Sequence, residues 1–469
     1  MIRRAVGFLD QRSGAGSVLG KALRYVFPDH WTFLFGEIAL YSFLILVATG
    51  IYLTLFFEPS SSQIVYHGSY APLHGQEVSK AYASALDLSF EVRAGLLIRQ
   101  VHHWTALVFL AAIVLHLMRI FFTGAYRKPR DLNYYIGLTM LTLAVVEGYA
   151  GYSLLDDLLS GMGLAIGNAV ALSVPGIGGQ LGTLVWGGRF PGSDAFFSRL
   201  YIAHVLIFPV LIGALMTLHL ALVAIPKHTQ FRGRRRSEAN VVGTPLWPGY
   251  ALRSLGLFFC VAAVLFALGG LVQINPIWQW GPYEPYLGTN GAQPDWYLGW
   301  LIGALRLMPH FDVVVAGYTL VPNPFWGGVL FPAVVFGFLY SWPTIERRLE
   351  HDQAQHNLLD RPRDNPRRTA IGAALFAWVA TIFFAGAADR AFVQLGAPYE
   401  GQLWGYRAAS LLVPIAAYFL TRRVCERLRE GEGHPGRGSG ARTVVRNPEG
   451  GFEELAPEPA PGVADSDRG

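Results

Sequence analysis

Eight apolar stretches recur along the chain. Each is roughly 18 residues or longer, the length that spans the hydrocarbon of a bilayer. Charged residues gather between the stretches, often together with Gly and Pro. This pattern predicts an all-α integral membrane protein with about eight transmembrane helices. We expect the spans near residues 32–57, 95–122, 134–155, 199–225, 249–272, 325–343, 369–388 and 406–421.

Lysine and arginine are distributed unevenly between the loops. They gather in the N-terminal segment and after the second, fourth, sixth and eighth spans, as in AYRKPRD at 125–131 and KHTQFRGRRR at 227–236. Because cytoplasmic loops carry an excess of these residues, we expect a multi-pass protein of the cell membrane with both termini in the cytoplasm. The long loops 156–198 and 273–324 then lie outside. Connections of that length usually serve a function or pack as short helices.

The patterning divides the chain into four regions. Residues 1–31 are basic and mildly amphipathic and lack the apolar core of a cleaved signal peptide. Residues 32–226 hold the first four spans as a four-helix bundle, and residues 227–429 hold the other four. Residues 430–469 are rich in Gly, Pro and acidic residues. We expect this tail to be disordered.

Composition excludes several kinds of site. The chain is 52% hydrophobic and 15% charged, and its two cysteines, Cys260 and Cys425, lie far apart without a CxxC or CxxCH motif. This argues against an iron–sulfur cluster, a structural zinc site or a covalently attached haem within the chain. We expect membrane lipid around the protein and no nucleic-acid partner.

Two histidines lie near opposite ends of the span 95–122. His102 and His116 are 14 residues apart, which on an α-helix places them within roughly 40° of one face and about 21 Å apart. This arrangement predicts two separate ligand sites, one near each membrane surface. His103 points about 100° away from His102 and is a poor candidate ligand. The alternative is that such histidines are hydrogen-bonded packing residues.

The span 199–225 repeats the arrangement. His204 and His219 are 15 residues apart, about 22 Å along the helix and within roughly 60° of one face. Both spans run inward, so His102 and His204 form an outer level and His116 and His219 an inner level. One histidine from each helix at each level is what bis-imidazole coordination of two haems requires. Zinc prefers about four ligands at one point, which this separation does not allow.

Glycines and arginines fit the same two levels. Gly36 and Gly50 lie in the first span and Gly137 and Gly151 in the third, again 14 residues apart in each pair. Glycine lets a flat porphyrin edge approach a helix, although small residues also mark ordinary helix contacts in membranes. Arginines suited to haem propionates lie near the histidines, although each could instead extend to the membrane surface. They are Arg99, Arg119 and Arg199.

With these residues in place, the chain resembles the cytochrome b subunit of cytochrome bc complexes, the quinol:cytochrome c oxidoreductases, over residues 25–425. Several motifs resemble actinobacterial members in particular. The motifs that carry the resemblance are RQVHHW, GYSLLDD, WGG at 186–188, RLYIAH, PDWY at 294–297, FPDHW at 27–31, FFTGAYRKPRD, KHTQF and LLDRPRDNP at 358–366.

The resemblance implies two non-covalent haems b, of low potential at the outer level and high potential at the inner level. Quinol, of the menaquinone type by the actinobacterial likeness, is oxidised at an outer site, and quinone is reduced at an inner site, generating a proton-motive force. The outer site is framed by Tyr152, the region near Gly163 and the PDWY residues Pro294, Asp295, Trp296 and Tyr297. Implied partners are a Rieske iron–sulfur subunit, a cytochrome c subunit, a second copy of the chain and a terminal oxidase in a supercomplex.

Asp295 stands where the family usually has Glu as the proposed proton acceptor for quinol. A carboxylate at a partly dry quinol hydroxyl can take up its proton, although an Asp after Pro can also simply cap a helix. Leu155 replaces a usual proline, which leaves the local backbone undetermined. For the inner site the sequence offers only His228, Glu37 and Arg253 as candidates.

Two other functions compete with this one. A transmembrane dihaem reductase for ferric iron or oxygen is also built on four histidines, but it would need a flavin and nicotinamide domain, and no GxGxxG after a strand is present. A haem-free transporter is the second alternative. Haem absorption and quinol-dependent reduction distinguish the three.

Overall fold

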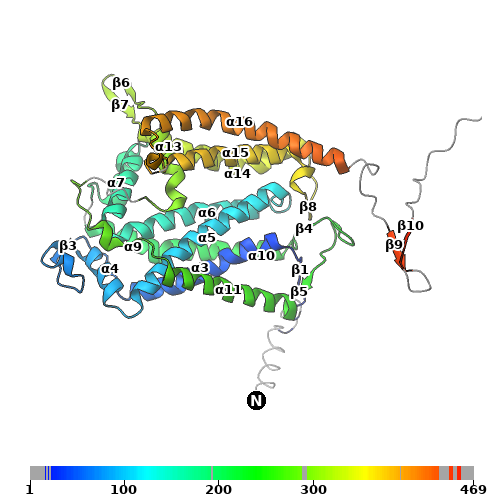
Figure 1. Ribbon diagram of the computed structural model, residues 1–469, viewed down its shortest axis with the longest axis horizontal. Helices are drawn as coiled ribbons and strands as arrows, with labels where there is room; N and C mark the ends of the chain where they lie inside the picture. The colour runs from blue at the N-terminus through cyan, green and yellow to red at the C-terminus, as the bar shows by residue number, and fades with distance from the viewer. Residues whose placement is uncertain are drawn as a thin grey trace, which may run out of the picture.

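The computed structural model describes residues 16, 20, 23–191, 194–287, 293–390, 392–432, 443–446 and 452–455. Among these residues, eight helices are long and apolar enough to cross a membrane, which confirms the predicted all-α class. The long helices lie side by side, and the connecting segments gather at the two ends of the molecule (Figure 1).

Each predicted span corresponds to one of these helices, in three cases after a turn of π-helix. The helices are α3 (Leu34–Thr54), α5 (Gly95–Thr123), α6 (Asp131–Tyr152), α9 (Asp194–Ile202) continuing through the π turn Ala203–Ile207 into α10 (Phe208–Ala224), the π turn Leu246–Tyr250 with α11 (Ala251–Leu271), the π turn Trp326–Leu330 with α14 (Phe331–Glu350), α15 (Pro366–Ala385) and α16 (Tyr399–Glu432).

Shorter helices cover the predicted outer end. They are α4 (Lys80–Phe90), α7 (Leu158–Leu172), α8 (Gly178–Trp186), α12 (Ile277–Trp280) and α13 (Gly299–Leu307). The long outer loops therefore do pack as short helices. Two hairpins lie at the same end, β2 (Gln63–Val65) with β3 (Glu77–Ser79) and β6 (Val313–Val315) with β7 (Tyr318–Val321).

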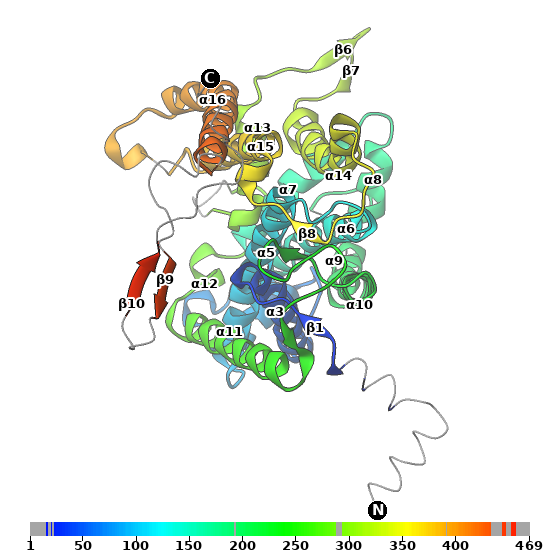
Figure 2. The same ribbon diagram turned by 90° about the vertical axis from the view of Figure 1, so that its right-hand side faces the viewer.

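Two strand pairs close the predicted inner end. β1 (Val26–Phe27) pairs antiparallel with β5 (Thr244–Pro245), and β4 (Gln230–Phe231) pairs parallel with β8 (Leu358–Leu359). The second pair joins the segment after α10 to the segment before α15. Seen from this end, α13, α15 and α16 form a group apart from α3, α5 and α10, while α11 packs on α3 and α5 (Figure 2).

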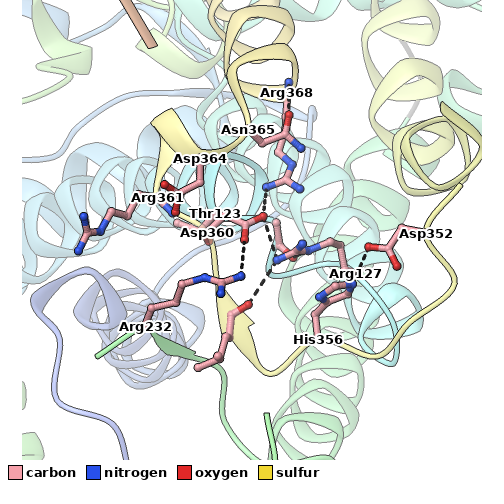
Figure 3. Close-up of polar contacts among 12 residues, drawn as sticks. Thr123, Arg127, Arg232, Asp352, His356, Asp360, Arg361, Asp364, Asn365 and Arg368 are labelled. Atoms are coloured by element: carbon pink, nitrogen blue, oxygen red, sulfur yellow. Dashed lines mark hydrogen bonds and ion pairs between the residues drawn. The ribbon is translucent and has the colours of Figure 1, made fainter. Parts of the chain in front are cut away.

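Charged side chains also join the two groups of helices at the inner end (Figure 3). Asp360, which follows β8, lies 3.0 Å from Arg368 Nη1 of α15 and 3.0 Å from Arg127 Nη2 of the α5–α6 loop. Arg368 Nε lies 2.5 Å from Glu346 Oε1 of α14. With Arg368 and Glu346 only 2% and 7% exposed in their side chains, these charges are compensated by one another and not by water.

The predicted tail differs from expectation in part. α16 continues to Glu432, and β9 (Thr443–Arg446) and β10 (Phe452–Leu455) form an antiparallel hairpin. Thr443, Val444 and Val445 are β-branched, which favours a strand. The rest of the expected disordered tail, like most of the N-terminal segment 1–31, lies outside the described residues.

Candidate functional site

The four histidines face one another in two pairs. The ring centroids of His102 and His204 are 6.2 Å apart at an interplanar angle of 81°, and those of His116 and His219 are 6.4 Å apart at 71°. An imidazole nitrogen lies about 2 Å from a metal that it coordinates, so two rings on opposite sides of one ion have centroids roughly 6 Å apart. Among the described residues no group of three or more His, Cys, Asp or Glu could hold a metal ion. The histidines therefore offer two ligands at each of two places.

A turn of π-helix brings His204 and His219 into phase. The turn Ala203–Ile207 contains His204, and α10 begins at its end. A π turn takes up about one residue more than an α turn. The 15-residue separation then rotates the rings about as far as the 14 residues between His102 and His116, so the offset of roughly 60° expected for an unbroken helix becomes roughly the 40° offset of the other pair.

Each predicted glycine lies against the histidine of its own level. A Cβ built on Gly36 would lie 3.1 Å from His116 Cε1, and one on Gly50 would lie 3.3 Å from His102 Cε1. On α6, a Cβ on Gly137 would lie 3.6 Å from His219 Cε1, and one on Gly151 would overlap His204 Cε1. α3 and α6 thus approach the rings from outside, and a Cβ would press on them at Gly36, Gly50 and Gly151 but not at Gly137.

The outer pair has polar partners that the sequence reasoning missed. His102 Nδ1 lies 2.9 Å from Thr49 Oγ1, and the hydroxyl hydrogen of Thr49 goes to the Ile45 carbonyl at 2.7 Å. Thr49 therefore accepts from His102 Nδ1–H, which leaves Nε2 free to bind a metal. His204 Nδ1 lies 3.0 Å from Glu147 Oε1, although the ring is not turned to form an aligned hydrogen bond. An acidic residue within a membrane span was a signal for Glu147.

Two of the three predicted arginines are buried beside the histidine levels. Arg99 is 7% exposed and Arg119 is 8% exposed. Arg99 Nη1 donates to the Asn275 carbonyl at 3.1 Å, and the Arg119 guanidinium lies 4.3 Å from the centre of the Phe33 ring. In both, Nε and Nη2 have no hydrogen-bond partner among the described residues. Arg199 differs, because it is exposed and donates to the carbonyls at the end of α8.

The inner pair opens into a cavity of about 510 Å³. His116, His219, Gly36, Gly137 and Arg119 line it, and the sequence had assigned all five to the inner level. Among the inner-site candidates, Glu37 and His228 also line this cavity. Burial lowers the pKa of His228 to about 4, and the positive charge of Arg119 adds to this effect.

The third inner-site candidate, Arg253, lies elsewhere. Its side chain is 67% exposed and pairs with Asp29 at 3.1 Å. Glu37 instead accepts hydrogen bonds from the Tyr250 hydroxyl at 2.6 Å and the Ser254 hydroxyl at 2.7 Å. Glu37 of α3, His228 of the segment after α10 and Tyr250 of the π turn before α11 therefore join the polar groups of α5 and α10 at this cavity.

At the outer end, Asp295 contacts α5 instead of capping its own helix. Asp295 is the N-cap residue of the 3₁₀ turn Trp296–Leu298, yet in the described structure its side chain makes no capping hydrogen bond. Its Oδ1 lies 2.8 Å from His103 Nε2. The capping alternative is therefore wrong for this structure. His103 was considered only as a metal ligand, so its contact with Asp295 was not foreseen.

Two buried tyrosines lie close to this carboxylate's loop. The Tyr297 hydroxyl would lie 2.8 Å from a Cβ on Gly148, and the Tyr152 hydroxyl 2.8 Å from a Cβ on Gly163. Tyr152 also donates to the Leu159 carbonyl at 2.7 Å. Tyr152 and Gly163 therefore meet, as expected for the predicted outer site. Burial raises the pKa of Tyr297 well above its usual value, and the nearby Asp295 adds to this effect.

The backbone after Tyr152 turns sharply where Leu155 replaces the usual proline. Ser153–Leu155 form a 3₁₀ turn, and Asp156 has a φ of 52°. Asp157 then caps α7 by accepting from the Ser160 N–H at 2.9 Å. Burial raises the pKa of Asp157 to about 6 and that of Asp156 to about 7. The turn is made without proline, and it places the buried carboxyl group of Asp157 and the half-buried one of Asp156 at this end.

Comparison with known proteins agrees with this architecture. The family model described as cytochrome b (N-terminal)/b6/petB matches residues 107–282. The chain is 44% identical over 455 residues to the cytochrome bc1 complex cytochrome b subunit of Streptomyces coelicolor, covering 96% of this chain and 83% of that protein. To the same subunit of Mycobacterium tuberculosis it is 47% identical over 426 residues, covering 91% and 77%.

A solved structure of a hyperthermophilic respiratory Complex III has the same fold. Its TM-score is 0.65 at 20% sequence identity, and the match covers 91% of this chain and 100% of that one. The fold and the histidines define a polytopic membrane protein whose four histidines face one another in two pairs.

The chain belongs to the family of cytochrome b subunits of cytochrome bc1 complexes. These are the catalytic membrane subunits of the respiratory quinol:cytochrome c oxidoreductases, and the membership confirms the resemblance seen in the motifs. A cytochrome b carries haem b and acts as one subunit of a larger complex. The membership also excludes the two alternative functions considered from the sequence, a transmembrane dihaem reductase and a haem-free transporter.

Proposed function

We propose that the chain binds two haems b, one between His102 and His204 and one between His116 and His219. The observation that carries this proposal is the facing of the two ring pairs, with centroids 6.2 and 6.4 Å apart. Bound there, the haems supply one-electron carriers at two depths of the membrane. Four nitrogens of each porphyrin complete a coordination to which the protein contributes only two ligands.

The surroundings of both pairs fit a porphyrin. Three of the four glycines on α3 and α6, Gly36, Gly50 and Gly151, leave room where a Cβ would press on the rings. Arg99 and Arg119 are buried with unpartnered nitrogens, although the charge of Asp157 acts on Arg99 without a hydrogen bond to these nitrogens. A buried guanidinium whose N–H groups lack a charged acceptor is costly. A haem propionate beside each arginine would supply that charge. We keep Arg199 as a weaker candidate for such a contact, because it is exposed.

Quinol oxidation is assigned to the outer end, where PDWY meets Tyr152 and the Gly163 region. Asp295 accepts a proton from the quinol hydroxyl, and the apolar faces of Trp296 and Tyr297 exclude water from that transfer. Pro294 fixes the entry of the chain into the turn. The support for this assignment is that Asp295 directs its side chain toward α5 and away from its own backbone.

Quinone reduction is assigned to the inner cavity of about 510 Å³. Apolar side chains cover most of its wall, as is usual for small-molecule sites. Glu37 and His228 are the polar groups that orient the quinone head or deliver protons to it. The low pKa of His228 keeps its ring neutral near pH 7, so it serves as a hydrogen-bonding partner without adding positive charge beside Arg119.

The wider assembly follows the same reasoning. Residues 32–226 form the haem-binding unit and residues 227–429 supply PDWY and the second group of helices. The basic loops place the termini in the cytoplasm of a bacterial cell, with the outer site across the plasma membrane. The sequence has no CxxC or CxxCH motif for an iron–sulfur cluster or a covalently attached haem, so a separate Rieske subunit and a cytochrome c subunit receive the electrons that do not pass inward through the haems. Menaquinol, a homodimer and a supercomplex with a terminal oxidase complete the proposal.

A redox titration with haem quantitation tests the two-haem assignment. The purified complex should yield two equivalents of non-covalent haem b per copy of this chain, which titrate at two separate potentials. Addition of a naphthoquinol should reduce both. One equivalent, or two that quinol does not reduce, would contradict the proposal.

Replacing Asp295 with Asn tests the outer site. Removal of a general base typically slows its step by about 100-fold or more, so quinol oxidation should fall by that order while both haems stay bound. Stopped-flow haem reduction measures the rate and difference spectra measure the haems. Glu77→Gln, which changes an exposed acidic residue of β3, is the matched control and should turn over normally. Unchanged turnover in Asp295→Asn would remove this residue from the site.

A further inference from the structure

His103 lies one residue after a proposed haem ligand but faces another part of the molecule. Its Nε2 is 2.8 Å from Asp295 Oδ1, and the two side chains are only 13% and 14% exposed. α5 carries the histidine, and the loop before α13 carries the aspartate. The contact therefore joins a rigid membrane helix to the PDWY segment, across 192 residues of sequence.

The direction of this hydrogen bond follows from the chemistry of its two ends. An ionised carboxylate can only accept, so Nε2 of His103 carries the hydrogen and donates it. Hydrogen bonds to a charged acceptor are roughly twice as strong as neutral ones. Within the described structure no backbone N–H of the following turn competes for the Asp295 side chain. The carboxylate is thus oriented by His103 of α5 and by no backbone N–H of its own turn, while the Tyr297 side chain of that turn also faces it.

Orientation matters more for Asp than for Glu at this position. The Asp side chain is one methylene shorter than the usual Glu, so it has less reach with which to find the quinol hydroxyl. His103 holds the carboxylate through Oδ1, and the carboxylate can still receive a proton because its two oxygens offer about four lone-pair sites. A misplacement of about 1 Å in a reacting group can cost roughly 100-fold in rate.

We propose that His103 is a positioning residue of the quinol-oxidation site, which holds the Asp295 carboxylate in place by donating a hydrogen bond to Oδ1. The inference rests on the proposed role of Asp295 and assigns to His103 no contact with quinol and no ligation of haem. It predicts that what matters at position 103 is a hydrogen-bond donor at the distance of Nε2.

Three variants of the intact complex test this, with naphthoquinol as donor and cytochrome c as acceptor. His103→Leu keeps bulk but has no donor, and its kcat should fall roughly 10- to 100-fold with little change in KM. His103→Gln places an amide N–H near the position of Nε2 and should recover most of the rate. His67→Leu, at an exposed histidine of the outer end, is the control and should match the unmodified complex.

Haem spectra and a double variant exclude a purely structural role. All three variants should keep both haems, since the His103 side chain does not point toward His204, the ring that faces His102. His103→Leu combined with Asp295→Asn should be no slower than Asp295→Asn alone, because both changes act on one group. Should His103→Leu disturb haem binding, His103→Asn replaces it: the shorter amide does not reach Asp295, so its rate should lie well below that of His103→Gln at equal haem content.

Several results would overturn the inference. They are an unchanged kcat in His103→Leu, equal losses in the Leu and Gln variants, equal rates in the Asn and Gln variants, or a double variant clearly slower than Asp295→Asn. These are distinguishable from failure of the proposed outer site. In that case Asp295→Asn itself would oxidise quinol at the normal rate.

Discussion

Glycine and histidine are matched residue by residue across the helices of the first group. The spacing in the sequence predicted which glycine belongs to which level, and the structure places Gly50 and Gly151 against the outer rings and Gly36 and Gly137 against the inner ones. The four contacts are not equally tight. Gly151 leaves no room for a Cβ, whereas Gly137 leaves an ordinary van der Waals distance of 3.6 Å.

Gly151→Ala should therefore weaken the outer haem selectively. The new methyl group would displace the His204 ring, because at this position it overlaps the ring. Haem content per chain should fall toward one equivalent, and the remaining haem should have the spectrum of the inner one. Gly137→Ala is the matched control: it should keep both haems, and alanine's better helix propensity should stabilise α6 by up to about 1 kcal/mol. Equal haem content in the two variants would contradict this reasoning.

Individual partners of the histidines were harder to predict than the histidines themselves. That His102 and His116 lie on one face follows from the period of a single α-helix, which their spacing in the sequence shows directly. Thr49, Glu147 and His103 depend on which faces of different helices meet, and a single sequence does not contain that information. His103 shows the difference clearly. Its direction away from His102 was predicted correctly, but the aspartate it meets lies 192 residues further along the chain.

At the scale of elements, the apolar windows located all eight spans but not their ends. α14 continues to Glu350 and α16 to Glu432, beyond the predicted limits of 343 and 421. The added turns are polar, and hydropathy does not register a helix that continues into water. In α14 these turns carry Glu346 and help to form the buried charge cluster with Arg368 and Asp360.

Arg368→Met should destabilise the complex without altering its haems. The substitution leaves Glu346 and Asp360 without their main buried counter-charge, and removing one member of a buried ion pair typically costs about 3–5 kcal/mol. The melting temperature of the purified complex should fall, while haem content and the turnover of the intact fraction stay normal. Arg127 still reaches Asp360, so the loss should fall mainly on Glu346.

Two further variants make that measurement specific. Arg422 pairs with Glu426 on the exposed surface of α16, and Arg422→Met should leave the melting temperature unchanged because exposed pairs contribute little. Adding Glu346→Gln to Arg368→Met should restore part of the lost stability, since it removes the unpaired charge. A double variant less stable than Arg368→Met would refute the pairing.

Across the whole molecule, the transmembrane helices differ in how much of their apolar surface the rest of the chain buries. In the span Asp131–Leu155, 39% of the apolar window is buried, but only 6% is buried in Ala195–Ala224 and in Tyr399–Glu430. In a membrane, lipid tails or neighbouring subunits must cover these two helices. The sequence predicted that all eight spans enter the membrane. It did not predict which of them lie at the edge, because apolar residues facing lipid and apolar residues facing another helix look alike in hydropathy.

A membrane helix that holds rings at two depths cannot ordinarily gain or lose a residue between them, since each residue rotates everything beyond it by about 100°. The π turn at Ala203–Ile207 contains about one residue more than an α-helical turn would. Deleting Val205 would return this stretch to an ordinary helix with His204 and His219 still in phase. α5 is an α-helix without a π turn, so deleting one residue between His102 and His116 would rotate the His116 ring away from His219. Between the two helices that carry the histidines, a change of length is therefore tolerated at a single place, beside the outer level.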